Sequence, residues 1–251
     1  MSRRRWCDVG AVASAAAIFS AIALISCSAE EANHSTNPPN VRHEPQPPIE
    51  SPPLALFIGD SYTAGNSSAE SSYGCRAAVE MGWLCAVSAF GNTGYVSGGP
   101  ANRWDDPYTG KSSSYSERIP HLAAKYDPAV VVLDGGRNDD FVSRKYAYDA
   151  MLMTIKEARR AWPEARIVVI RPRLLANPSD NAGMSDEFME RLLAEPGAQG
   201  VIFVDPIGSL ADTDTSGLLA SDGVHPNRLG EQRMTKALVE SLRRHQMGSS
   251  P

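Results

Sequence analysis

Short apolar runs alternate with amphipathic stretches from residue 54 almost to the carboxyl end of the chain. Runs of strand length that end at glycine, proline or polar residues predict five buried strands, over residues 54–58, 83–90, 129–133, 166–170 and 201–204. Apolar residues at helical spacing predict three helices, over residues 141–162, 185–194 and 226–245. This alternation indicates βαβ units, so we expect an α/β fold: a three-layer α/β/α sandwich around a parallel sheet.

Two long polar segments interrupt this alternation, over residues 97–116 and 171–183. Loops of this length in a compact domain often bind ligands or cover a site, and we expect both near the carboxyl ends of strands. The first contains Trp104, Tyr108 and Tyr115. These aromatic side chains either form a platform for a sugar ring or pack the loop against the domain.

The first 26 residues have the pattern of an export signal. Three arginines precede an alanine-rich apolar stretch over residues 11–25, which is shorter than a comfortable membrane span. The stretch ends in Leu24-Ile25-Ser26-Cys27, which resembles the lipobox of bacterial lipoproteins. The resemblance implies a lipidated Cys27 and an exported protein on the cell membrane, facing the extracellular or periplasmic side. An ordinary signal peptide with a coincidental cysteine, or an uncleaved anchor, is the alternative.

The remaining chain divides into a tether, one folded domain and a short tail. Seven of the 18 prolines fall between residues 28 and 53, and no aromatic residue does, so residues 27–53 predict a disordered tether. Residues 54–246 are long enough, in a chain that is 42% hydrophobic, for one domain with a single core. We expect a monomer, with residues 247–251 as a disordered tail.

Charge excludes two classes of partner. The formal net charge is −5, and without residues 1–26, which hold three basic side chains and one acidic, it is −7. An acidic domain binds nucleic acid and anionic lipid surfaces poorly. We therefore expect no nucleic-acid partner and contact with the membrane only through an N-terminal lipid anchor.

Cysteine usage is consistent with export. Besides Cys7 and Cys27, the chain contains Cys75 and Cys85. A pair of cysteines in an exported chain indicates a disulfide that closes a small loop, although two buried free thiols are the alternative. Because no Cys/His cluster has the spacing of metal ligands, we expect neither a metal nor another cofactor.

Ser61 is the candidate nucleophile. It follows the strand over residues 54–58 and the pair Gly59-Asp60, at the edge where open α/β sheets bind ligands. A serine hydroxyl needs an adjacent base to attack at neutral pH, and a backbone N–H at this turn can face a developing oxyanion. A simple helix-capping role is the alternative reading of the same residue.

The candidate base is His225, which follows Asp222 by three residues in a glycine-containing loop. On a tight turn this spacing lets the carboxylate hold Nδ1–H and leaves Nε2 for the serine. A loop histidine capped by a loop aspartate is the alternative. The other four histidines are less well placed. His34 and His43 lie in the tether, and His245 lies at the end of the last helix. The nearest carboxylate after His121 is six residues further along the chain.

Oxyanion donors are expected at two further strand ends. Glycine lets the backbone approach a substrate and direct its N–H inward, which suits Gly91, with Gly94 as the alternative. Asn138 follows the valine-rich strand and offers a side-chain NH₂. With the Ser61 N–H, these groups would make three donors.

These segments resemble the conserved blocks I, II, III and V of the GDSL/SGNH hydrolase family. The matching residues are Gly59-Asp60-Ser61, Gly91, Gly136-Arg137-Asn138-Asp139 and Asp222-Gly223-Val224-His225-Pro226. The resemblance covers residues from about 54 to 245 and departs from the family pattern at Tyr62, where the family often has leucine. It implies a flavodoxin-like five-stranded parallel sheet, Ser61 as nucleophile, His225 as base and acid, Asp222 as its orienting carboxylate, and Ser61, Gly91 and Asn138 as oxyanion hole.

The expected function is that of a serine hydrolase that cleaves carboxylic esters through an acyl-enzyme at Ser61. We expect short acyl esters, on cell-envelope carbohydrate or lipid, with Asp60, Trp104 and Arg137 in contact with the substrate. The same residues would serve an acyltransferase acting on envelope glycans. A non-catalytic, ligand-binding envelope lipoprotein is the alternative from another class.

Overall fold

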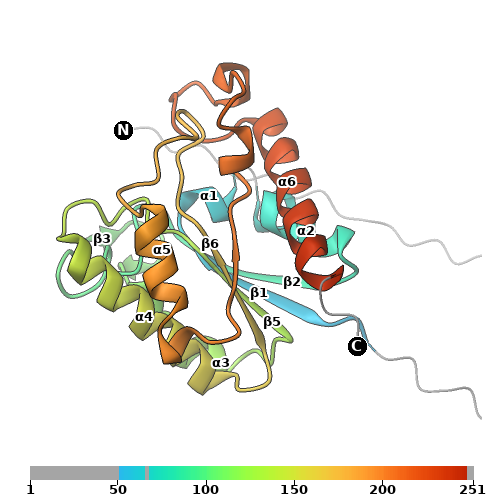
Figure 1. Ribbon diagram of the computed structural model, residues 1–251. Helices are drawn as coiled ribbons and strands as arrows, with labels where there is room; N and C mark the ends of the chain where they lie inside the picture. Colours follow the sequence, from blue (N-terminus) through green and yellow to red (C-terminus); the bar gives the residue numbers. More distant parts are fainter. Residues whose placement is uncertain (1–50, 66–67, 248–251) are drawn as a thin grey trace, which may run out of the picture. The chain divides into compact units, whose positions relative to one another are not determined.

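The computed structural model describes residues 51–65 and 68–247 (Figure 1). The expected export signal, the lipobox at Cys27 and almost all of the tether lie outside the described residues, as do residues 248–251. Within the described part, no helix has the length and apolar character needed to cross a membrane.

The domain is built on one sheet of five parallel strands in the order β2-β1-β5-β6-β7. The strands are β1 (Leu54–Gly59), β2 (Leu84–Ala89), β5 (Val130–Asp134), β6 (Arg166–Ile170) and β7 (Ile202–Val204). The predicted α/β fold with a five-stranded parallel sheet is confirmed, and the predicted strand ends differ by at most a residue or two. Because β1 pairs with both β2 and β5, its carboxyl end lies at the point where the strand order reverses.

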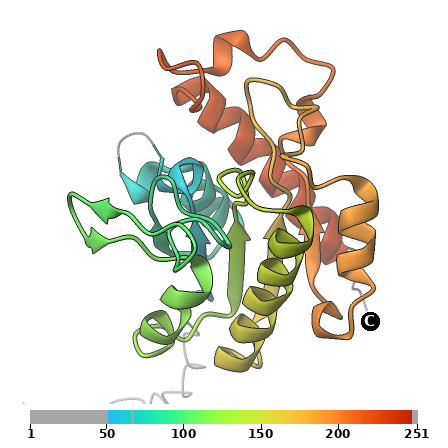
Figure 2. The ribbon, with the colours of Figure 1, turned by 90° about the vertical axis from the view of Figure 1, so that its left-hand side faces the viewer.

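Helices cover both faces of the sheet (Figures 1 and 2). One face carries α2 (Tyr73–Glu80) and α6 (Arg228–Met247), and the other carries α3 (Tyr115–Ala123), α4 (Arg144–Ala161) and α5 (Asp186–Leu193). Alternate residues of β1 serve the two faces: Ala55 and Phe57 pack with α2 and α6, whereas Leu56 and Ile58 pack with α3 and α4. This two-residue period explains why the central strands appear as continuous apolar runs.

Serine side chains begin several of the helices. Ser72, Ser143 and Ser185 accept hydrogen bonds from the backbone N–H three residues on, at the starts of α2, α4 and α5. At the start of α3, the Ser114 backbone N–H donates to Glu117 Oε2 at 2.9 Å. The spacing of apolar residues does not predict α2 and α3, since both helices are short and α3 contains Pro120.

The segment over residues 97–116 is more ordered than a loop. It contains a small antiparallel hairpin of β3 (Asp105–Asp106) and β4 (Gly110–Lys111). Tyr115 is fully buried at the start of α3 and its hydroxyl donates to the Asp134 carbonyl at 3.0 Å. Of the two alternatives for Tyr115, packing against the domain therefore holds, because the ring belongs to the core.

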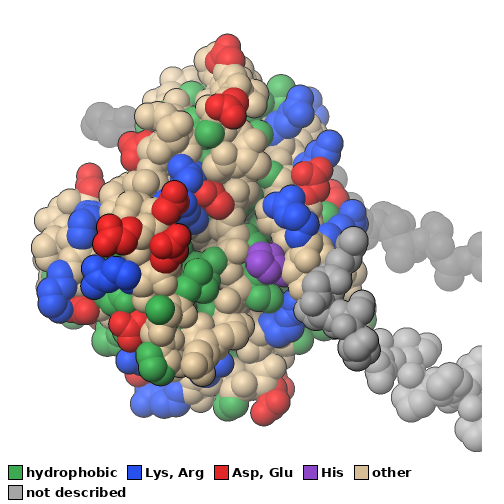
Figure 3. All heavy atoms as spheres, viewed as in Figure 1, with side chains coloured by type: hydrophobic (Ala, Val, Ile, Leu, Met, Phe, Trp, Pro, Cys, Tyr) green, Lys and Arg blue, Asp and Glu red, His purple; other side chains and the backbone are tan. Residues whose placement is uncertain are grey.

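Cys75 in α2 and Cys85 in β2 form the expected disulfide, with their Cα atoms 5.4 Å apart. Acidic and basic side chains are interspersed over the face shown in Figure 3, which carries no broad basic patch among the described residues.

Candidate active site

Ser61 is the first residue of α1 (Ser61–Ala64), a single helical turn that follows β1 directly. Asp60 caps this turn, and its Oδ1 accepts from the Tyr62 backbone N–H at 2.9 Å. The preceding residue must be glycine, because a Cβ on Gly59 would lie 1.8 Å from the Thr63 hydroxyl oxygen. The chain thus turns sharply and presents Ser61 at the carboxyl edge of the sheet.

Three side chains from two distant segments meet at this edge. His225 Nε2 lies 2.8 Å from Ser61 Oγ, and His225 Nδ1 lies 2.7 Å from Asp222 Oδ2. The other carboxylate oxygen of Asp222 accepts from the backbone N–H groups of Val224 and His225 at 2.9 and 3.0 Å. In the loop before α6, the Asp222 carboxylate therefore holds both the His225 ring and the loop backbone.

The electrostatics of Asp222 fix the tautomer of the imidazole. The hydrogen bond from His225, followed by those from the two backbone N–H groups, lowers the pKa of Asp222 to about 2. An ionised carboxylate only accepts hydrogen bonds, so Nδ1 carries the proton and donates to it. Nε2 of the neutral ring is then the acceptor for the Ser61 hydroxyl, which is the arrangement that general-base activation requires.

Gly91 and Asn138 both lie close to the nucleophile. A Cβ built on Gly91 would lie 3.9 Å from Ser61 Cβ, so the Gly91 backbone passes beside the serine. Asn138 lines the same pocket as Ser61, and its Nδ2 donates to the Thr93 carbonyl at 3.0 Å. That bond orients the amide and uses one of its two N–H groups.

Gly94, the alternative donor, is directed elsewhere. Its N–H donates to the Ser97 carbonyl at 3.0 Å, and a Cβ on it would lie 2.4 Å from the Asp139 carboxylate. Asp139 accepts from the backbone N–H groups of the three residues that follow Gly94. This geometry favours Gly91 as the backbone donor.

The hollow around Ser61 is small. Its volume is about 120 Å³, and its lining includes Asp60, Tyr62, Asn92, Arg137, Asn138, Leu174, Val224 and His225. Two of the three expected substrate contacts, Asp60 and Arg137, thus line this hollow. Trp104 does not, and it lines a separate, larger pocket instead.

A buried charge cluster lies beneath the hollow. Arg137 Nη1 lies 3.1 Å from Asp60 Oδ2, and Nη2 lies 3.0 Å from Asp134 Oδ1. Burial raises the pKa of Asp60, while the Arg137 cation opposes this rise. Asp134 Oδ2 accepts from Thr63 Oγ1 at 2.6 Å and from the Tyr73 hydroxyl. Asp60, which precedes Ser61, and Arg137, which precedes Asn138, are thus held together by an ion pair.

Tyr62 connects this cluster to the loop that carries His225. Its ring lies 4.4 Å beneath the Arg137 guanidinium, and its hydroxyl donates to the Val224 carbonyl at 2.6 Å. The same hydroxyl accepts from the Leu175 backbone N–H at 3.2 Å. The hydroxyl therefore fixes two loops that a leucine at this position could not hold.

Comparison with known proteins identifies the family of the chain. The model of the GDSL-like lipase/acylhydrolase family matches residues 57–233. The chain belongs to this family. A GDSL lipase of Mycobacterium tuberculosis, Rv0518, is 30% identical over 201 residues, which cover 74% of this chain and 80% of that protein. This GDSL-family chain is accordingly an esterase-type hydrolase.

Solved structures of carbohydrate esterases show the same fold. A family two carbohydrate esterase from Clostridium thermocellum superimposes with a TM-score of 0.57 at 22% identity, covering 78% of this chain and 65% of that one. The chain thus spans slightly less than two thirds of that esterase. Est24, a carbohydrate acetylesterase from Sinorhizobium meliloti, has a TM-score of 0.54 at 15% identity, covering 76% of this chain and 98% of its own. At these identities the likeness concerns the fold.

The local sequence of this GDSL-family hydrolase does not predict the buried charge cluster. Asp134 closes the valine-rich strand, and a fully buried carboxylate at a strand end requires partners. The position of Asp134 at the end of this strand is the one sequence feature that indicates the cluster. The partners Tyr73 and Thr63 come from other segments, and nothing in their local sequence indicates the contact.

Proposed function

We propose that this chain hydrolyses carboxylic esters with short acyl groups through an acyl-enzyme on Ser61. The observation that carries the proposal is the 2.8 Å contact between Ser61 Oγ and His225 Nε2, in a ring held at its other nitrogen by Asp222. A nucleophile, a base and an orienting carboxylate in contact support acyl transfer chemistry.

In the first half of the reaction, Ser61 Oγ attacks the ester carbonyl carbon while its proton passes to His225 Nε2. The negative charge that develops on the carbonyl oxygen is stabilised by the N–H groups of Ser61 and Gly91 and by Asn138 Nδ2. The tetrahedral intermediate then collapses. The bond to the alcohol oxygen breaks, and that oxygen takes the proton from Nε2 as the alcohol leaves.

In the second half, water cleaves the acyl-enzyme. His225 Nε2 takes a proton from the water as its oxygen attacks the acyl carbon, and the same three donors stabilise the second oxyanion. Collapse breaks the bond to Ser61 Oγ, which regains the proton from Nε2. The products are the carboxylic acid and the free enzyme, and Asp222 stays ionised throughout.

The size of the hollow supports a short acyl group. Its volume of about 120 Å³ is well below the ~300–1,000 Å³ typical of sites for drug-sized ligands. The backbone around Gly91 and the side chains of Leu174 and Val224 limit the space beside Ser61. We propose carbohydrate as the alcohol, a choice supported by the carbohydrate esterases among the structural relatives.

We also propose that the enzyme works outside the cytoplasm. The lipobox-like segment that ends at Cys27 supports export and lipid attachment. The Cys75–Cys85 disulfide supports an oxidising compartment. Labelling with a radioactive fatty acid tests the anchor: the wild-type chain should incorporate label and the Cys27→Ala variant should not.

Kinetics with a series of p-nitrophenyl esters test the proposed reaction. We expect kcat/KM to be highest for acetate and butyrate and to fall for octanoate and palmitate, with a burst of nitrophenol where deacylation limits turnover. Ser61→Ala should abolish both burst and turnover. A preference for palmitate would overturn the short-acyl assignment, and a burst in the Ser61→Ala variant would overturn the acyl-enzyme at Ser61.

A further inference from the structure

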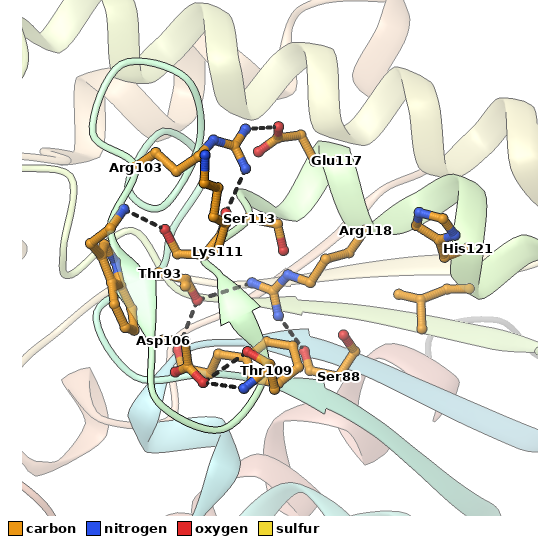
Figure 4. Close-up of a pocket in the computed structure, with 14 residues that line it drawn as sticks. Ser88, Thr93, Arg103, Asp106, Thr109, Lys111, Ser113, Glu117, Arg118 and His121 are labelled. Atoms are coloured by element: carbon orange, nitrogen blue, oxygen red, sulfur yellow. Dashed lines mark hydrogen bonds and ion pairs between the residues drawn. The ribbon is translucent and has the colours of Figure 1, made fainter.

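A second and larger pocket lies between α3 and the segment over residues 103–113 (Figure 4). Its volume is about 530 Å³, and it shares no lining residue with the hollow around Ser61. We call it the α3 pocket, and its lining includes Ser88, Thr93, Trp104, Thr109, Lys111 and Arg118. The proposed ester hydrolysis does not use this pocket.

The wall of the α3 pocket contains a buried cation with no carboxylate partner. Arg118 is 5% exposed, and its guanidinium donates to the carbonyls of Gly59 and Ser88 and to the Thr93 hydroxyl, which are neutral acceptors. Among the described residues, no carboxylate lies within ion-pair distance of it. Burial lowers the pKa of Arg118 to about 10. The guanidinium also lies over the rings of Phe90 and Tyr115, 5.1 and 4.7 Å from their centroids. Because neither these rings nor the hydrogen-bond acceptors carry a net charge, an anion in the pocket would stabilise the buried cation further.

The other charged groups of the pocket leave an excess of positive charge. Arg103 is paired with Glu117, and Asp106 Oδ1 accepts from the backbone and hydroxyl of Thr109. Lys111 is exposed and forms no ion pair within the described part of the chain. Figure 4 shows Arg103 and Lys111 entering from the 103–113 segment and Arg118 from α3 on the facing side.

The α3 pocket also has donors without acceptors among its lining residues. Two buried N–H groups, Trp104 Nε1 and Arg118 Nε, have no hydrogen-bond partner among the described residues. A buried donor without an acceptor is uncommon in native proteins and indicates a missing partner. A ligand rich in oxygen atoms would supply acceptors on this side of the pocket.

We propose that the α3 pocket binds a sugar that carries a carboxylate. The hydroxyls of Ser88 and Thr109 suit a polyhydroxylated ring, and the Trp104 indole offers it an apolar face. Lys111 pairs with the sugar carboxylate, and Arg118 adds positive potential from the wall behind it. The aromatic residue expected to contact a sugar thus serves this pocket and not the hollow at Ser61.

Titration calorimetry with sodium glucuronate and with glucose tests the proposal on the full chain. Glucuronate should bind at least about tenfold more tightly than glucose, because only it can pair with Lys111. Lys111→Gln should weaken glucuronate binding by about tenfold and leave glucose binding unchanged. Lys236→Gln, at an exposed lysine of α6, is the matched control and should bind as the wild type does.

A second readout places the ligand. The Trp104 indole N–H signal in a nitrogen-15 correlation spectrum, assigned with Trp104→Phe, should shift on addition of glucuronate. No binding, equal affinity for glucose, or an unaffected Lys111→Gln variant would overturn the proposal, as would sodium sulfate binding as tightly as glucuronate. Ser61→Ala should retain glucuronate binding, and Lys111→Gln should retain hydrolysis of p-nitrophenyl acetate, so failure here is separable from failure of the ester reaction.

Discussion

At the scale of single residues, the site depends on side chains that each fix the next one. Asp222 holds His225 through Nδ1 and through the backbone, and His225 in turn meets Ser61 at Nε2. Asp222 and His225 are both partly exposed, with side chains that are 50% and 32% accessible. These side chains are therefore held in place by hydrogen bonds and not by burial.

Asp222→Asn should lower kcat for p-nitrophenyl acetate by ~10²–10⁴ with little change in KM. Asparagine can keep the two backbone contacts through Oδ1, but its NH₂ would donate to His225 Nδ1. The imidazole proton would then sit on Nε2, where it could not accept from Ser61. Circular dichroism should show an unchanged fold, and a variant with near wild-type kcat would show that Asp222 does not set the tautomer.

Acid should destabilise the fold through the same carboxylate. The pKa of Asp222 is about 2 in the folded protein and 3.8 as an ordinary aspartate, so its stabilising effect is complete above about pH 4 and is lost as the pH falls through 2. Urea unfolding at pH 7 and at pH 3 should show a smaller loss of stability on acidification for Asp222→Asn than for the wild type. Equal losses would contradict the sign of this shift.

Asn138→Ala should lower kcat by about two to three powers of ten while the fold persists. The variant loses one of three donors to the oxyanion, together with the bond that holds the amide to Thr93. Asn102→Ala, at an exposed asparagine, is the matched control and should keep full activity. Full activity in Asn138→Ala would remove this residue from the oxyanion hole.

At the scale of elements, the site is assembled from the loops that follow β1, β2, β5 and β6 and from the loop that precedes α6. The loop after β5 is joined to β1 by the Arg137–Asp60 ion pair and to the loop after β2 by the bond from Asn138 to Thr93. The Tyr62 hydroxyl joins the turn after β1 to the loop after β6 and to the loop before α6. Each loop is thus held to its neighbours by polar contacts beneath the reacting groups. We infer that this layer keeps Ser61 and His225 in contact.

Tyr62→Phe should reduce both stability and turnover. Loss of the hydroxyl leaves the Val224 carbonyl and the Leu175 N–H without their partner, which costs about 1–3 kcal/mol of unfolding free energy. Because Val224 adjoins His225, we also expect kcat to fall while KM changes little. Denaturant titration and steady-state kinetics measure both effects, with Tyr108→Phe as the control, since that ring is 93% exposed. An unaffected Tyr62→Phe variant would contradict the connecting role.

The disulfide should stabilise the edge of the sheet. It joins α2 to β2 across a sequence separation of 10 residues, and closing a loop of that length contributes about 2–3 kcal/mol. Reduction of the wild type should lower the free energy of unfolding by that amount. A Cys75→Ala, Cys85→Ala double variant should not respond to the reductant, and an equal response in both would assign the effect to other cysteines.

At the scale of the whole molecule, the sequence predicts the fold more completely than it predicts the site. Apolar runs such as the one over residues 129–133 fix strands locally, and glycine or proline ends them, so the layers followed from the sequence alone. Ser61 and His225 could be paired because each has a local signature, a strand end and a neighbouring carboxylate. Arg118 and Tyr73 carry no such signature, since their roles depend on partners tens of residues away.

The central claim is that the Ser61 hydroxyl, activated by His225, is the nucleophile. Mass spectrometry of the chain after treatment with a fluorophosphonate tests it most directly, because this reagent traps activated serines as a covalent adduct. We predict one adduct, on the peptide that contains Ser61, no adduct in Ser61→Ala, and strongly slowed labelling in His225→Ala. An adduct on another serine, or rapid labelling of the His225→Ala variant, would contradict the account.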